Sequence, residues 1–159
     1  MSETATSSTT VVVGIDGSDA SMAALRFALR EADTLGADVD VVHCWHAGGL
    51  RDVAFGSSHE LSNASACMLD NEIRAARKDT GFTGRVTPSS VHGQPAAVLV
   101  DRSRGAALLV LGAHGHSTLR DAAFGTVAAS CRKHAGSDLV VVAEDGTTTR
   151  HLHTAITVS

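Results

Sequence analysis

The feature that most constrains the fold is an alternation, along residues 10–143, of short β-branched runs with longer Ala-rich amphipathic stretches. Short apolar runs bounded by turn residues indicate strands, and apolar residues recurring every three or four positions indicate helices. Strands that alternate with helices are typical of βαβ units, in which successive strands lie parallel. The pattern therefore predicts an α/β domain built on a doubly wound parallel sheet.

Five strands and four helices are expected within this alternation. The strands are predicted over residues 11–15, 39–45, 85–91, 107–111 and 139–143, and the helices over 19–35, 57–80, 95–105 and 126–135. Because the first, fourth and fifth strands are almost continuously apolar, helices should cover both faces of the sheet. Residues 1–9 and 145–159 are polar and lack periodicity, so they are expected to be flexible tails of a domain that spans residues 10–144.

Composition excludes several classes of protein. The formal net charge of −4 offers no basic field for nucleic acid. No apolar run approaches the roughly 18 to 20 residues that a membrane span requires. Cys44, Cys67 and Cys131 lack metal or redox spacing, so they are expected to be small buried hydrophobic residues in a protein of the reducing cytoplasm.

Two glycine-containing loops follow predicted strands, at residues 14–18 and residues 112–126. Ligands of open parallel sheets bind beyond the carboxyl ends of the strands, where the strand order reverses. Glycine lets backbone N–H groups approach a phosphate, and a helix N-terminus adds partial positive charge. These loops therefore predict a site for a phosphorylated ligand.

Side-chain chemistry at the loops is sparse. Lys78 and Lys133 are the two lysines of the chain and neither follows a glycine loop, which excludes a P-loop; no G-x-G-x-x-G follows the first strand either. Backbone groups would thus hold the phosphates, with the Thr126 hydroxyl available to a phosphate or a divalent ion and Asp16 to ribose hydroxyls. Structural alternatives stay open, since the glycines could merely turn the chain and Asp16 could be a turn former.

A more specific signal comes from the segment LVLGAHGHSTLRDAAFGTV, residues 109–127. It resembles the universal stress protein signature G-x2-G-x9-G-[ST], which Gly112, Gly115, Gly125 and Thr126 satisfy. VVVGIDGSDASMAALRFAL and VVHCWH are similar to the first strand, loop and helix and to the second strand of that family. The resemblance covers about residues 11–143.

The resemblance implies a five-stranded parallel sheet of order 3-2-1-4-5 with four helices on both faces, as in adenine nucleotide alpha hydrolase-like domains. Members of the family that keep the signature bind ATP, and this sequence keeps it. The base and ribose would lie near the first two strands and the phosphates near the signature loop. The nucleotide-binding residues implied are Gly14, Ile15, Asp16, Cys44, Gly112, His114, Gly115, His116, Gly125, Thr126 and Val127. His116 could add positive charge near a phosphate or be an exposed loop side chain.

Three functions are compatible with these residues. The favoured one is an ATP-binding regulator of the stress response, with or without Mg²⁺. An alternative is a slow ATPase or autophosphorylating protein that uses Thr126 or a nearby serine as acceptor, although no set of general base, paired carboxylates and phosphate lysine is present and no catalytic residue is assigned. The third is a nucleotide-free structural or chaperone-like dimer.

Two further expectations concern partners. His114-x-His116 and His151-x-His153 have spacings that can bind a metal, but no Cys, Asp or Glu completes an obvious site, so no metal is assigned. The apolar residues 140–142 would form an exposed sheet edge if unpaired, and proteins usually cover such an edge. A homodimer through the fifth strand is therefore expected, although Ser137-Asp138 replaces the Cys-Pro or Lys-Pro pair that many relatives have there.

Overall fold

A computed structural model of the chain describes residues 9–46, 58–113 and 126–154, and the structural statements below concern these residues. In chain order the elements are β1 (Thr10–Gly14), α1 (Asp19–Leu35), β2 (Asp38–Trp45), α3 (Ser58–Thr80), β3 (Val86–His92), α4 (Pro95–Ser103), β4 (Leu108–Gly112), α5 (Thr126–His134), β5 (Leu139–Val142) and β6 (Thr148–His151).

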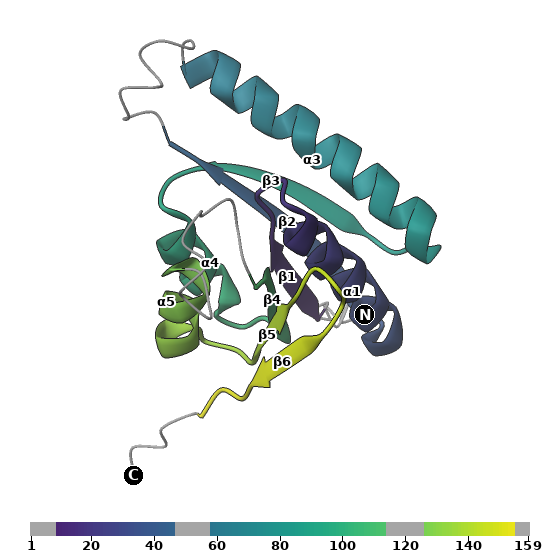
Figure 1. The fold of residues 1–159 in the computed structure, drawn as a ribbon, viewed down its shortest axis with the longest axis vertical. Coiled ribbons are helices and arrows are strands. Elements are labelled where there is room, and N and C mark those ends of the chain that lie inside the picture. The colour runs from purple at the N-terminus through teal and green to yellow at the C-terminus, as the bar shows by residue number, and fades with distance from the viewer. Residues whose placement is uncertain (1–8, 47–57, 114–125, 155–159) are drawn as a thin grey trace, which may run out of the picture.

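The sheet has the order β3-β2-β1-β4-β5-β6 (Figure 1). Its first five strands pair in parallel, and β1 is flanked by β2 on one side and β4 on the other. The predicted order 3-2-1-4-5 is thus confirmed, with a sixth strand added at the end. The reversal of strand order falls between β1 and β4.

Helices cover both faces of the sheet (Figure 1). Alternate residues of β1 point to opposite faces, as the period of two in a strand requires. Val11 and Val13 join a buried cluster with α1 and α3, whereas Val12 packs in a second cluster with residues of α4 and α5. Of the four helices described, α1 and α3 therefore cover one face of the sheet, and α4 and α5 cover the other.

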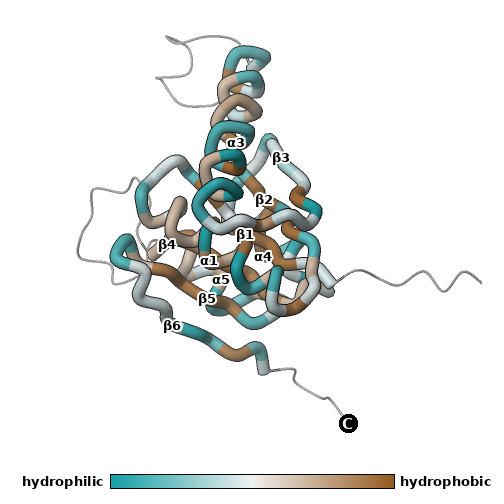
Figure 2. The backbone as a smooth tube through the Cα atoms, turned by 90° about the vertical axis from the view of Figure 1, so that its right-hand side faces the viewer, coloured by the Kyte–Doolittle hydropathy of each residue, from teal (hydrophilic) through white to brown (hydrophobic). Residues whose placement is uncertain are grey.

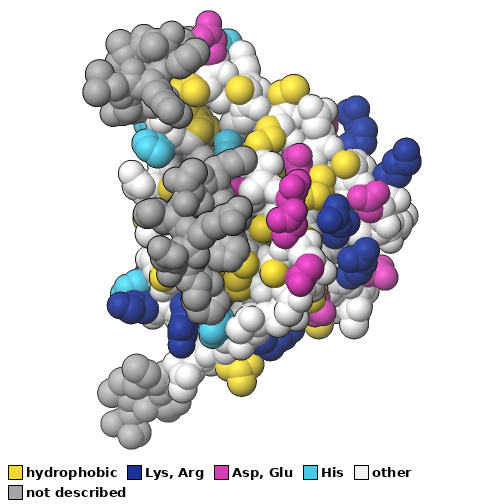
Figure 3. Space-filling model, in the orientation of Figure 1, with side chains coloured by type: hydrophobic (Ala, Val, Ile, Leu, Met, Phe, Trp, Pro, Cys, Tyr) yellow, Lys and Arg dark blue, Asp and Glu magenta, His cyan; other side chains and the backbone are white. Residues whose placement is uncertain are grey.

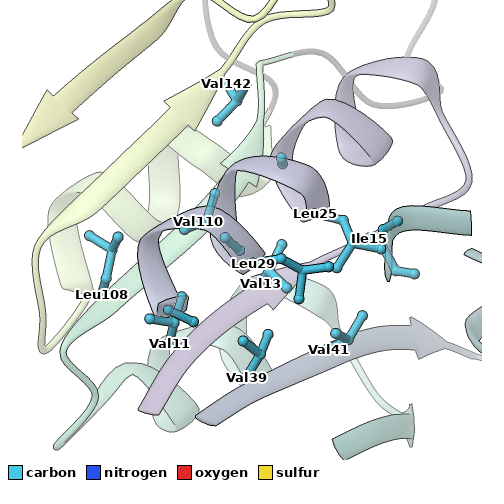
Figure 4. Close-up of a cluster of buried hydrophobic side chains, with 14 of the residues drawn as sticks. Val11, Val13, Ile15, Leu25, Leu29, Val39, Val41, Leu108, Val110 and Val142 are labelled. Atoms are coloured by element: carbon cyan, nitrogen blue, oxygen red, sulfur yellow. The ribbon is translucent and has the colours of Figure 1, made fainter. Parts of the chain in front are cut away.

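The larger core lies between α1 and the sheet, where Leu25 and Leu29 of α1 meet valines of several strands (Figure 4). Leu29 and Val110 are fully buried, so the amphipathic pattern of the sequence indicates the correct face of α1. Hydrophobic residues follow the central strands, whereas α3 is mixed in character and one of its ends extends beyond the sheet (Figure 2).

The ends of α1 are those expected from its sequence. The Ser18 side chain accepts a hydrogen bond from the Ser21 N–H at 3.2 Å, which caps the first turn. Gly36 has φ +64°, in the left-handed region that glycine adopts at low cost, and it ends the helix. The β1–α1 connection is therefore held in one conformation by its own polar groups.

The expectation of a flexible tail from Asp145 onward needs a correction, because β6 lies within it. Gly146 has φ +89°, and the Asp145 carboxylate accepts the Thr147 N–H at 2.9 Å, so a tight turn leads β6 back along β5. Arg150 then lies 3.7 Å from Asp138 and 3.9 Å from Glu31. Sequence patterning missed β6 because only one of its edges is paired and its residues are polar.

β6 also occupies the sheet edge through which a homodimer was expected to form. Val140 and Val142 pair with Arg150 and Thr148 in an antiparallel ladder, so the outer edge of β5 is covered within the chain. The premise of an exposed apolar edge at β5 was therefore wrong.

Two smaller expectations can be compared with the structure. Of the three cysteines expected to be buried, Cys131 is buried, Cys44 is only half-buried and Cys67 is exposed on α3. Among the described residues, no helix has the length and apolar character needed to cross a membrane.

Candidate functional site

The two strands that meet at the reversal of strand order, β1 and β4, end side by side. Val13 pairs with Val110, which brings Gly14 and the end of β4 to the same edge of the sheet. We call the region formed by Gly14–Asp16 and Gly112–Ala113 the β1/β4 edge. Both glycine loops singled out from the sequence begin there, in the position where ligands of parallel sheets bind.

On the β1 side, the side chains that pack beneath the edge leave no room for a side chain at Gly14. A Cβ at Gly14 would lie 2.8 Å from Leu111 Cδ2 and 2.9 Å from Leu99 Cδ1. The next residue, Ile15, buries its side chain in the α1/α3 core and donates its N–H to the Val42 carbonyl at 2.9 Å. The Ile15 side chain thus faces the core, and only its backbone could line a ligand.

Asp16 occupies the turn between β1 and α1. Its Oδ1 accepts the Ser18 N–H at 3.0 Å, and its own N–H donates to Ser21 Oγ at 3.3 Å. The turn-forming role considered for this aspartate is therefore present. The same bond fixes the half-buried carboxylate group at the β1/β4 edge, so a ligand role is not excluded by it.

Acidic groups surround Asp16 on the α1/α3 side of the edge. Burial raises the pKa of Glu72, the Arg26 charge lowers it, and the charges of Asp19 and Asp16 raise it further. Acidic side chains are also visible on this face of the molecule (Figure 3). The carboxylates of Asp16, Asp19 and Glu72 would repel a polyphosphate from this side of the edge.

His43, which sequence reasoning did not select, lies within electrostatic reach of Asp16. Burial lowers the pKa of His43, and the Asp16 charge opposes that shift. The His43 Nδ1 lies 2.7 Å from Ser65 Oγ, and the Ser90 hydroxyl donates to the same oxygen at 2.7 Å. Trp45 Nε1 donates to Ser90 Oγ at 3.0 Å, so a polar chain links α3, β2 and β3. The sequence signal that could have identified this polar chain is His43 itself, a histidine at an inward-facing position of the valine-rich strand β2.

On the β4 side, Gly112 lies against the first turn of α1. A Cβ there would lie 2.8 Å from both the Ala20 carbonyl carbon and the Ser21 nitrogen, which are backbone atoms. Ala113 continues the strand by donating its N–H to the Val142 carbonyl at 2.8 Å. The absence of a side chain at Gly112 thus has a packing reason that is independent of any ligand.

Cys44 lies near the end of β2, half-buried against the α4/α5 cluster. Burial raises the pKa of its thiol to about 11, although the Arg102 charge acts in the opposite direction. The thiol is therefore protonated at neutral pH. It is a poor nucleophile, and a role for this residue rests on its backbone groups.

The helix that follows the signature begins at Thr126, which is exposed, and Val127 is half-buried against the α4/α5 cluster. An exposed hydroxyl at a helix N-terminus is suited to a phosphate oxygen. His114, Gly115, His116 and Gly125 lie outside the described residues, so their predicted place around the phosphates stays a prediction.

Metal ligation finds no support in the part of the chain that is described. No group of three or more His, Cys, Asp or Glu residues there is arranged to hold a metal ion. His151 is the last residue of β6 and His153 follows two residues later, and β6 is separated from β1, which leads to Asp16, by two strands.

The family described as the universal stress protein family matches residues 8–143. Universal stress protein Mb2028c of Mycobacterium bovis is 33% identical over 138 residues, which cover 84% of this chain and 44% of that protein. Universal stress protein Mb2019 of the same organism is 25% identical over 93% of this chain and 52% of its own length. The chain thus spans about half the length of the curated relatives it matches.

Solved structures show the same fold. The universal stress protein UspA from Lactobacillus plantarum superimposes with a TM-score of 0.69 at 23% identity, covering 84% of this chain and 96% of that one. A universal stress protein solved in complex with cAMP has a TM-score of 0.66 at 26% identity, covering 86% of this chain and 98% of that chain.

Proposed function

The chain belongs to the universal stress protein family, and on that premise we propose that it binds an adenine nucleotide, ATP in particular, at the β1/β4 edge. The observation that carries the proposal is the pairing of β1 with β4, which places the Asp16 turn beside the strand that leads into the signature loop. A relative that is 26% identical was solved with cAMP, which supports an adenine nucleotide as the ligand class.

The ligand is held mainly by backbone groups in this proposal. Gly14, Ile15 and Cys44 line the base and ribose with main-chain atoms, and Asp16 accepts from a ribose hydroxyl. Gly112 lies near the ribose. The phosphates are surrounded by His114, Gly115, His116, Gly125, Thr126 and Val127, where the N-terminus of α5 supplies partial positive charge. A bound Mg²⁺ would neutralise phosphate charge that no lysine of the edge can balance.

We propose a regulator of the stress response rather than an enzyme. The described residues of the β1/β4 edge include no lysine. Asp16 and the nearby Asp19 and Glu72 are not part of any group arranged to hold a metal ion in the described residues, whereas phosphoryl transfer normally requires paired metal ligands and a phosphate-binding cation. The free cysteines agree with action in the reducing cytoplasm. Slow hydrolysis or autophosphorylation on Thr126 is the second candidate, because that hydroxyl is exposed at the helix N-terminus.

A homodimer stays part of the proposal, but its interface needs a new location. Pairing of two copies through β5 would require β6 to leave the edge that it covers. Light scattering on the full chain, and on a chain shortened after Glu144, distinguishes the possibilities. A dimer that forms only in the shortened chain would show that β6 blocks pairing.

Mass analysis of nucleotide released by heating the purified protein tests the ligand assignment. Release of ATP, or of another adenine nucleotide, is expected, whereas a protein that carries none and binds none on addition would contradict the proposal. Incubation with γ-labelled ATP and Mg²⁺ tests the second candidate. Neither free phosphate nor labelled protein above a Gly115→Val control is expected.

A further inference from the structure

A cavity lies at the end of the sheet opposite the β1/β4 edge. It is open to solvent, has a volume of about 530 Å³ and is lined by the last turn of α5, the start of β5 at Leu139 and the end of β6 at His151. Because β5 runs parallel to β1 and β4, the start of β5 is opposite the β1/β4 edge. Sites for small molecules typically measure about 300–1,000 Å³, so this cavity, called here the basic pocket, has the size of a ligand site.

The charge of the basic pocket is opposite to that of the chain. Arg132, Lys133 and His134 line one wall and His151 and His153 line the other, and no Asp or Glu is among the lining residues described. The whole chain, by contrast, carries 17 acidic and 13 basic residues. Dark blue and cyan side chains gather over α5 at the lower left of Figure 3. The lining of the pocket thus contains two cationic side chains and several N–H groups.

The neighbouring carboxylate does not cancel this charge. Asp138 Oδ1 accepts the His153 N–H at 2.7 Å, and its Oδ2 lies 3.7 Å from the Arg150 guanidinium. Asp138 therefore fixes the chain after β6 as a wall of the pocket and is itself paired with a cation.

The pocket is also partly apolar. Leu152 in its lining is 73% exposed and is one of two large apolar side chains exposed in the described chain, whereas Leu139 and Cys131 lie almost fully buried behind the pocket surface. An exposed leucine beside cationic groups suits a ligand that has both an apolar body and a negative charge.

The dipole of α5 explains the basic residues on one wall of the pocket but not the residues on the other. Basic residues in the last turn of a helix compensate its dipole, which accounts for Arg132, Lys133 and His134 without any ligand. It does not account for His151, Leu152 and His153, which approach from another element. From this convergence we propose that the basic pocket binds a small organic anion with an apolar body, a carboxylate or a phosphate monoester, independently of the β1/β4 edge.

Fluorescence titration with 8-anilinonaphthalene-1-sulfonate, an anion with an apolar body, tests the proposal on the full chain. One saturable site is expected, with roughly five- to tenfold weaker binding in the double variant Arg132→Ser, Lys133→Ser. The matched control, Arg74→Ser, Lys78→Ser, removes the same charge from α3 and should bind as the wild type does. Leu152→Asp, a change at an exposed position that packing does not constrain, should weaken binding by a similar factor.

Competition identifies the ligand class and the location. Octanoate and hexyl phosphate should displace the probe, and the stronger of the two shows which anionic group is preferred, whereas octylammonium should not displace it. The probe should still bind the basic pocket when ATP is saturating. Because the two sites are independent, the result for the basic pocket holds even if the protein does not bind ATP. Absence of saturable binding, equal weakening in both double variants, or displacement by ATP would overturn the proposal.

Discussion

Gly112 at the end of β4 lies so close to Ser21 of α1 that a Cβ would come within 2.8 Å of the Ser21 backbone nitrogen. Backbone atoms in a capped helix cannot move aside as a flexible side chain can. Gly112→Ala should therefore lower the free energy of unfolding by roughly 1–3 kcal/mol, the usual cost of overpacking. Urea unfolding measures it.

Gly14→Ala provides the comparison, because the atoms nearest to its Cβ would be side-chain atoms of Leu111 and Leu99. A smaller loss of stability is expected there than in Gly112→Ala. Equal losses would contradict the packing account. The comparison also matters for function, since reduced nucleotide binding in a Gly112 variant would not by itself prove contact with the ligand.

The partly buried ion pair between Asp40 and Arg102 gives a second prediction. Their side chains are 17% and 35% exposed, Asp40 Oδ2 lies 2.8 Å from Arg102 Nη1, and the Ser89 hydroxyl donates to Asp40 Oδ1 at 2.6 Å. Arg102→Ala should cost about 1–3 kcal/mol of unfolding free energy, because it leaves the carboxylate without its charged partner.

Arg74→Ala is the matched control, because the Arg74–Asp70 pair has the same 2.8 Å distance but side chains that are 75% and 67% exposed. Its cost should stay below about 1 kcal/mol, as for exposed pairs in general. A control that is as costly as Arg102→Ala would show that burial is not the cause.

His43 predicts a pH dependence of stability. Burial lowers the pKa of His43 from its ordinary 6.5, with a smaller opposing effect of Asp16. Above that value the imidazole is neutral in both states and its contribution to stability is complete. As the pH falls below it, the unfolded chain takes up the proton more readily, and stability is lost until the folded pKa is passed.

His43→Gln should consequently lose less stability than the wild type when the pH is lowered from about 7.5 to about 5.5. Chemical unfolding at both pH values measures the difference. His59→Gln, at an exposed position of α3, serves as the control and should behave as the wild type. If all three proteins showed the same pH dependence, His43 would not be the cause of the loss of stability at low pH.

The cysteines should differ in reactivity. Burial raises the pKa of Cys44 and of Cys131 to about 11, so about one molecule in a thousand carries either thiolate at pH 8. Cys67 is exposed. Titration with a disulfide reagent should show one fast thiol per chain, and Cys67→Ser should remove that phase. A fast phase that survives this substitution would contradict the burial of the other two.

The fold can be predicted from local sequence patterns wherever the buried residues of an element are apolar and its exposed residues are polar. The apolar runs of β1, β4 and β5, the Ser18 cap and the Gly36 stop are all visible in the sequence because packing and backbone geometry act directly on those residues. β6 is the exception. Its four residues, Thr148 to His151, are largely exposed, so the ladder to β5 depends on backbone pairing that leaves no periodic pattern.

The candidate site was less predictable than the fold. Strand order brings the ends of β1 and β4 together, but the sequence could not show that Ile15 faces the core or that Gly112 is constrained by α1. His43 and Glu72 come from distant elements and approach Asp16 only through tertiary packing. The basic pocket likewise joins the end of α5 to a segment that was expected to be a tail.

The central claim, nucleotide binding at the β1/β4 edge, is tested most directly by calorimetric titration with ATP. If the phosphates lie beside Gly115 as proposed, Gly115→Val puts a side chain in their path, whereas Ala75→Val introduces the same side chain at an exposed position of α3. We expect one ATP per chain in the wild type and in Ala75→Val, with affinity reduced at least roughly tenfold in Gly115→Val. No binding by the wild type, or unchanged affinity in Gly115→Val, would contradict the account.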